Sequence, residues 1–267
     1  GQRLAENRQK VKQGIVSGLA FLQDEGIFNN KLVPSEPAVY LVCALWAEVE
    51  RLGSDAEGFA RSFLRKVLWR ACVVERYGKT AATRAYTDHR VLVPALLAGD
   101  MSPDCLLFDT EQFGLPQVQD IVNAGWPGRS EALPRATLAL ALRHGGKDFA
   151  TGKIASPGNF WEREYHHIVP IKALGLSRDD PRANRAMNCA RINWQVNRQI
   201  AGSEPSDYIA ARAEAAALGE ADVRERLDSH LISYDALMKD DYGAFIDDRA
   251  HRFHNYLVAL CDGRVRS

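Results

Sequence analysis

Two adjacent histidines, His166 and His167, stand directly before the segment Ile-Val-Pro. Asn188 follows His167 by 21 residues, and Asn197 follows Asn188 by nine. A neutral histidine, with an ordinary pKa of about 6.5, is suited to take a proton from water near neutral pH. An imidazole and an amide oxygen can hold one divalent cation, and a buried amide can fix a loop. This spacing predicts metal-assisted hydrolysis at a finger made of two strands and a helix.

The residues around these side chains predict the elements that position them. From 147 to 193 the chain is rich in Gly and Pro, with short candidate strands at 165–169 and 189–192. Helical periodicity returns directly after the second strand, in the segment WQVNRQIAG. The predicted order is therefore strand, long loop, strand, helix, which is the order of a ββα-metal finger.

Helical periodicity dominates the rest of the chain, so the expected fold class is mainly α: a helical body with an embedded ββα-metal finger. The first helix carries a stripe predicted to be buried, formed by Val11, Ile15, Leu19 and Leu22. The helices are expected at 4–23, from Ser35 onward, and at 57–76, 80–98, 116–123, 131–143, 205–218, 221–232 and 242–261. We expect three domains: helices at 1–146, the finger at 147–212, and helices packing on it at 213–267.

Four segments, in chain order, carry a resemblance to a known family: DFATGKI, EYHHIVP, NCARINWQVNRQIAG and PSDYI. They resemble the HNH, or His-Me finger, endonucleases, and more closely the carboxy-terminal nuclease half of the GmrSD-type restriction enzymes, which include the SspE proteins. Upstream, FLRKVLWRACVVERYG resembles the helical segment that precedes the nuclease in these proteins. The resemblance implies a metal-dependent DNA endonuclease or nickase, the effector of a bacterial restriction or phage-defence system.

The resemblance also implies a role for each residue of the pattern. His167 would be the general base, and Asn188 would hold the loop. His166 and Asn197 would bind one divalent cation, which would stabilise charge on the scissile phosphate and the leaving 3′ oxygen. Position 166 is more commonly acidic in this family. Because imidazole is a softer ligand than carboxylate, we expect Mn²⁺, Ni²⁺ or Zn²⁺ to serve at least as readily as Mg²⁺.

DNA is the expected partner, and Arg191 and Arg198 flank the site as candidate phosphate contacts. An ion pair or a solvated helix face would explain these two arginines equally well. Full-length relatives carry an amino-terminal sensor domain linked to nucleotide hydrolysis, and its motif does not occur in this sequence. The resemblance therefore implies that an NTPase or sensor domain of the same protein, or a partner defence protein, supplies targeting.

The bulk composition excludes several classes. No apolar run approaches the 18 or so residues that a membrane span requires, and the amino terminus lacks the apolar core of a secretory signal. The five cysteines are scattered without a C-x-x-C pair, as is typical of reduced cytoplasmic thiols. We therefore expect a cytoplasmic protein without a disulfide framework or a Cys-based zinc site.

Other readings of the same residues remain open. The chain could be a catalytically inactive helical module that docks on DNA or on a partner, or an RNase with the same chemistry. His166 and His167 could be a loop or core pair, Asn188 a turn residue, and Asn197 a helix cap. Three further interpretations concern side chains outside the pattern. His251 and His254 share a helix face but lack a third ligand, and Trp161 and Trp194 more simply pack the loop than stack on bases. Trp46, Trp69 and Trp126 are most simply core residues.

The formal net charge of zero is a sum of unequal parts. Residues 129–212 carry 13 positive and 8 negative side chains, whereas residues 213–248 carry 3 and 10. The segment that holds the finger is therefore basic by five charges, ten of its cations being arginine. This excess predicts modest, salt-sensitive affinity for nucleic acid and reliance on another domain for targeting.

Overall fold

The computed structural model describes residues 2–49, 52–53, 56–128, 131–193, 203–214 and 219–264. Helices make up most of these residues and the sheet has only two strands, so the expectation of a mainly helical fold is confirmed. In the described ranges, no helix combines the length and apolar character needed to cross a membrane. All five cysteines are free thiols.

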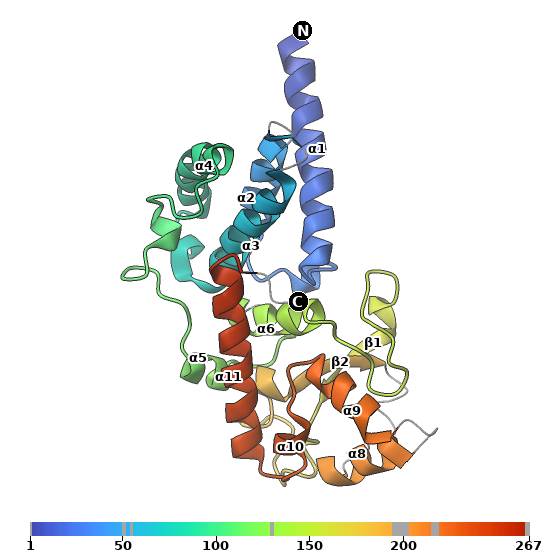
Figure 1. The fold of residues 1–267 in the computed structure, drawn as a ribbon. Coiled ribbons are helices and arrows are strands. Elements are labelled where there is room, and N and C mark those ends of the chain that lie inside the picture. Colours follow the sequence, from blue (N-terminus) through green and yellow to red (C-terminus); the bar gives the residue numbers. More distant parts are fainter. Residues whose placement is uncertain are drawn as a thin grey trace. The chain divides into compact units, whose positions relative to one another are not determined.

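The chain divides into two compact units whose boundaries differ from the three domains expected above. Unit 1 comprises residues 1–25, 33–116 and 256–267, and unit 2 comprises residues 26–32 and 117–255. The elements of unit 1 are α1 (Gln2–Asp24), α2 (Glu36–Val49), α3 (Glu57–Val73), η4 (Glu75–Tyr77), α4 (Ala81–Ala98) and η5 (Leu106–Phe108) (Figure 1).

Unit 2 contains the strands and the remaining helices. Its elements are η1 (Asn30–Leu32), α5 (Val118–Asn123), α6 (Ala132–Arg143), η6 (Phe160–Glu162), β1 (Arg163–His167), η7 (Ala186–Asn188), β2 (Cys189–Asn193), α8 (Pro205–Glu214), α9 (Gly219–Asp228) and α10 (Tyr234–Leu237). The last helix, α11 (Tyr242–Cys261), begins in unit 2 and ends in unit 1. Both strands lie within three residues of the positions that the sequence predicted.

The core of unit 1 surrounds α3, where Phe63, Leu64 and Leu68 are fully buried. Glu25 is buried beside it, and its carboxylate accepts hydrogen bonds from Arg65 Nε at 2.9 Å and Trp69 Nε1 at 2.8 Å. A buried carboxylate is stable in such a core only when charge and hydrogen bonds compensate it. These side chains come from the segment FLRKVLWRACVVERYG, whose polar residues therefore serve the packing of this unit.

Helix α1 packs on α2 through small residues and not through the expected apolar stripe. Leu22 is buried, but Val11, Ile15 and Leu19 are exposed by 58%, 46% and 48%. A Cβ at Gly14 would lie 2.6 Å from both the Ala47 Cβ and the Cys43 carbonyl oxygen. The sequence prediction was wrong for these three apolar residues. Gly14 and Gly18, one turn apart, let the backbones of α1 and α2 approach closely on a neighbouring face of α1.

The close approach at Gly14 predicts that Gly14→Ala destabilises the protein although alanine favours helices. Helix propensity would gain about 1 kcal/mol. Overlap with α2 backbone at 2.6 Å should outweigh that gain and leave a net loss of roughly 1–3 kcal/mol. Urea unfolding followed by circular dichroism measures the difference.

Gly58 in α3 supplies the matched control for this prediction. A Cβ at Gly58 meets nothing within 4 Å, so Gly58→Ala should leave stability unchanged or raise it by up to about 1 kcal/mol. A Gly14→Ala protein that is at least as stable as the parent would show that the two helices do not pack as closely as described.

Candidate active site

The candidate site lies at the end of an antiparallel hairpin within unit 2. In the register of β1 and β2, Arg163 faces Asn193, Tyr165 faces Arg191 and His167 faces Cys189. Because successive side chains along a strand point to opposite faces, His167 shares its face with Tyr165 and Arg191, and His166 points to the other face. His166 is buried, whereas His167 is partly exposed.

Asn188 joins the two ends of the loop that connects the strands. Its side chain is fully buried, and its Oδ1 accepts a hydrogen bond from the Val169 backbone N–H at 2.8 Å. Its Nδ2 donates to the Val169 carbonyl at 3.0 Å and to the Ala183 carbonyl at 3.1 Å. The Asn188 carbonyl accepts from the Ile168 N–H at 2.9 Å. We call these four bonds the Asn188 clasp; they fix the two residues that follow His167.

Two helices hold the backbone on either side of the clasp. Buried Arg249 of α11 donates from Nη1 to the carbonyls of Met187 and Cys189, at 2.6 and 3.0 Å, and burial lowers the pKa of this guanidinium to about 9. Tyr208 of α8 donates its hydroxyl to the Ile168 carbonyl at 2.8 Å. Tyr208 is the aromatic residue of the PSDYI segment, so that segment supports the backbone next to His167.

The His167 ring contacts Trp126 and Asn184 through their side chains. The ring stacks on Trp126, with centroids 4.1 Å apart and planes inclined by 18°. Its Nε2 lies 3.1 Å from Asn184 Oδ1. Burial lowers the pKa of His167 below its ordinary value and the charge of Arg178 lowers it further, while the bond to Asn184 opposes the shift. The imidazole is therefore neutral at neutral pH, the form that can accept a proton.

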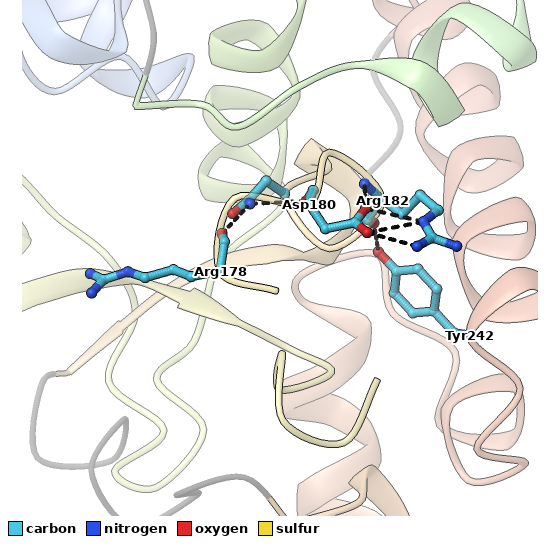
Figure 2. Close-up of polar contacts among 5 residues, drawn as sticks. Arg178, Asp180, Arg182 and Tyr242 are labelled. Carbon is cyan, nitrogen blue, oxygen red and sulfur yellow. Dashed lines mark hydrogen bonds and ion pairs between the residues drawn. The ribbon is translucent and has the colours of Figure 1, made fainter. Parts of the chain in front are cut away.

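Asn184 belongs to a turn with several internal polar contacts. Its Nδ2 donates to the carbonyls of Arg178 and Asp180, at 2.7 and 3.0 Å. The Arg182 guanidinium binds the Asp180 carboxylate, and the Tyr242 hydroxyl, from the first residue of α11, donates to the Arg182 carbonyl (Figure 2). The Arg178 side chain extends away from the other labelled residues in this view. The turn is thus tied both to itself and to α11.

The segment DFATGKI supports the other end of the hairpin. Buried Asp148 accepts hydrogen bonds from the Thr151 N–H at 2.8 Å and the Asn193 N–H at 2.7 Å. Burial raises the pKa of Asp148, but these and further hydrogen bonds outweigh burial and lower it overall. Arg163 in β1 donates to the carbonyls of Gly146, Lys153 and Arg191. Residues 146–153 are therefore fastened to both strands.

The residues expected to bind metal are only partly described. His166 is 4% exposed and lies on the opposite face of β1 from His167. Asn197, expected as the second ligand, lies outside the described residues, as does the helix expected to carry it. In the described ranges, no group of three or more His, Cys, Asp or Glu side chains is arranged to hold a metal ion. His251 and His254 in α11 form no such group either.

The arginines expected to contact phosphate fall into two cases. Arg198 lies outside the described residues. Arg191 is 7% exposed, with its guanidinium carbon 3.9 Å from the Phe160 ring centroid and 4.7 Å from that of Tyr165. In this conformation Arg191 packs between two aromatic rings instead of facing solvent. Arg163 is buried as well, so the basic excess of residues 129–212 is smaller at the surface than in the sequence.

Sequence reasoning missed three neighbours of His167. Trp126 was expected to be simply core, Asn184 carried no signal beyond its place in a polar loop, and Arg178 is an exposed cation close enough to lower the pKa of His167. Trp161 is 67% exposed and touches Phe160 edge to face. Trp194 lies outside the described residues. Long-range contacts of this kind leave no periodic trace in a sequence.

In comparison with known proteins, no family model and no curated protein matches this chain.

Proposed function

We propose that this chain is a metal-dependent endonuclease of the HNH, or His-Me finger, type that nicks DNA, with His167 as the general base. The Asn188 clasp is the observation that carries the proposal. The resemblance in the sequence implies that Asn188 holds the loop after His167. A fully buried amide that bonds the backbone two residues beyond His167 is what such a role requires.

The surroundings of His167 support proton transfer. Its ring is neutral at neutral pH because burial and Arg178 lower its pKa. It is partly exposed, so water can reach it, and stacking on Trp126 limits its rotation. In the proposed reaction the ring takes a proton from water as the water oxygen attacks phosphorus. The P–O3′ bond then breaks, and the leaving oxygen keeps the electron pair and is protonated from solvent.

A divalent cation is part of the proposal, held by His166 and Asn197. The donor set fits in chemistry, since an imidazole and an amide oxygen are both neutral ligands that Mn²⁺, Ni²⁺ or Zn²⁺ accept. Because these are only two protein ligands, water and phosphate oxygens would supply the rest of the coordination. When bound, the cation would supply positive charge for the phosphate and the leaving oxygen. His166 and His167 point to opposite faces of β1, so the metal requirement needs its own experiment.

Arg178 is the phosphate contact that best fits the described residues. It is exposed and lies close enough to His167 to affect the pKa of its ring. Arg182, also exposed, binds Asp180, which offsets its charge, and Arg191 is buried between two rings. We therefore propose that Arg178 takes the positioning role for which Arg191 and Arg198 were considered. The modest local charge is consistent with targeting by a sensor domain or a partner defence protein.

Incubation of the full chain with supercoiled plasmid tests the function directly. Mg²⁺, Mn²⁺, Ni²⁺ and Zn²⁺ are supplied separately, each with and without EDTA, and a single-stranded RNA is run in parallel. We expect conversion of supercoiled to nicked plasmid that EDTA prevents. Cleavage of RNA alone would replace the proposal by an RNase. Failure to cleave either substrate with any metal would overturn it in favour of a docking module.

A further inference from the structure

We infer that Asn184 is a positioning residue that holds His167 as the tautomer protonated on Nε2, with Nδ1 left as the unprotonated nitrogen. The inference rests on the two bonds that Asn184 Nδ2 donates to backbone carbonyls and on the contact of Asn184 Oδ1 with the His167 ring. That Nδ1 accepts the proton from water rests on the proposed function. The tautomer itself does not, because it follows from hydrogen-bond chemistry alone.

The orientation of the Asn184 amide is the first step. Its Nδ2 lies 2.7 Å from the Arg178 carbonyl oxygen and 3.0 Å from the Asp180 carbonyl oxygen. Both carbonyls only accept hydrogen bonds, so the atom facing them must be the NH₂ group. A flipped amide would place its own oxygen against two others and lose both bonds. The hydrogen-bond network therefore assigns Oδ1 to the side of His167.

The tautomer of His167 follows from that orientation. Asn184 Oδ1 lies 3.1 Å from the ring Nε2 and has no proton to donate. The hydrogen of this bond must then belong to Nε2. A neutral imidazole carries one N–H, so Nδ1 keeps a free electron pair. An unconstrained neutral ring in water populates both tautomers, and Asn184 removes that freedom.

Three further contacts keep the His167 ring and the turn of Asn184 in this orientation. Trp126 stacks on the ring at 4.1 Å, which fixes the plane of the ring, while the bond to Asn184 fixes its rotation within that plane. The turn that carries Asn184 is itself fastened, since Asp180 binds Arg182 and Tyr242 donates to the Arg182 carbonyl (Figure 2). In the proposed reaction the bond from Nε2 survives, because the ring gains its second proton at Nδ1 and keeps the first.

NMR spectroscopy of protein labelled with ¹⁵N-histidine tests the inference without any substrate. Long-range ¹H–¹⁵N correlation at pH 8 reports which ring nitrogen carries the proton, and His167→Ala assigns the signals. We expect a protonated Nε2 with a slowly exchanging hydrogen and a bare Nδ1. In Asn184→Ala the Nε2 proton should exchange rapidly and both tautomers should appear. Asn184→Asp keeps an oxygen that accepts from Nε2 but loses the donor to the carbonyls of Arg178 and Asp180, so it should restore the parent pattern only in part.

Asn159→Ala is the matched control for loss of a turn asparagine. Asn159 also bonds two backbone groups of its own turn, the Ser156 N–H and the Ile154 carbonyl. This variant should leave the His167 signals unchanged. A proton on Nδ1 in the parent protein would overturn the inference, and so would an Asn184→Ala spectrum identical to that of the parent.

Cleavage assays separate the inference from the proposed function. If the chain nicks plasmid, Asn184→Ala should lower kcat by about 10- to 100-fold, with KM for DNA unchanged, and Asn184→Asp should restore part of the rate. If the chain cleaves nothing but the spectra are as expected, the tautomer stands and the proposed function fails. If the chain cleaves but Nδ1 carries the proton, the proposed function stands and the inference fails.

Discussion

Replacing His167 by alanine is expected to abolish the nicking of supercoiled plasmid while the protein stays folded. A positioned general base contributes about 100- to 10,000-fold to the rate of a hydrolysis, and Ala provides no group to accept the proton. The structural cost is small, because the ring is partly exposed and its main contacts are one stacking partner and one hydrogen bond. We expect a loss of roughly 1–2 kcal/mol in unfolding free energy.

The rate of nicked-plasmid formation with Mn²⁺, measured alongside the circular dichroism spectrum, checks this prediction. His251→Ala is the matched control. His251 is exposed in α11, and its Nδ1 bonds only the Asp247 carbonyl of the same helix. The control should cleave at the rate of the parent protein. If His167→Ala also cleaves at that rate, the base is another residue and the proposed mechanism is wrong.

Asn188→Ala is expected to have the largest effect on stability. The substitution removes three hydrogen bonds and leaves the Val169 N–H and the carbonyls of Val169 and Ala183 without those partners in a buried region. Each unsatisfied buried group costs about 1–3 kcal/mol. We therefore expect a loss of about 3–5 kcal/mol in unfolding free energy, with loss of cleavage because the backbone after His167 is released.

Asn188→Asp separates the bond that the side-chain oxygen accepts from the two bonds that the side-chain nitrogen donates. Aspartate keeps an oxygen for the Val169 N–H, but it cannot donate to the two carbonyls and brings negative charge against them. It should therefore destabilise the protein at least as strongly as alanine. Urea unfolding measures both variants, with Asn255→Ala, an exposed position of α11, as the control expected within about 0.5 kcal/mol of the parent. A loss below about 1 kcal/mol for Asn188→Ala would contradict the clasp.

The clasp and the turn of Asn184 assign different tasks to two asparagines in one loop. Asn188 acts on backbone, so its loss should lower stability and activity together. Asn184 acts on the orientation of one ring, so its loss should change the tautomer and kcat with less effect on folding. The two variants together separate a structural from a positioning role, since only one of them should move the unfolding free energy by several kcal/mol.

The surface around His167 is less basic than the sequence suggests. Arg163 and Arg191 are buried, and Lys147 pairs with Glu225. Burial keeps the guanidinium groups of Arg163 and Arg191 from direct contact with a phosphate, and the ion pair with Glu225 offsets the charge of Lys147. Arg178 is exposed and lies close enough to the proposed base to lower the pKa of its ring. Weak, salt-sensitive binding is therefore expected of this chain, consistent with dependence on a separate targeting domain.

Periodicity in the sequence was sufficient to predict the helices and the order of the hairpin, because both depend on near neighbours. Helices predicted at 57–76 and 80–98 lie at Glu57–Val73 and Ala81–Ala98, and the second strand begins at Cys189 as expected. The same reasoning was wrong about Val11, Ile15 and Leu19. Periodicity shows which helix face is apolar, but the face that packs was decided by the glycines that allow α2 to approach.

The sequence by itself determined the mainly helical fold, the hairpin, and a short set of candidate residues, chiefly the two histidines and the two asparagines that follow them. Only the tertiary structure showed that Asn188 is fully buried and bonds Val169, that His166 and His167 point to opposite faces, and that Arg191 is buried. Trp126 and Asn184 contact His167 from 41 residues before it and 17 residues after it in the chain. Such contacts depend on how distant segments pack, which no local pattern of residue types records.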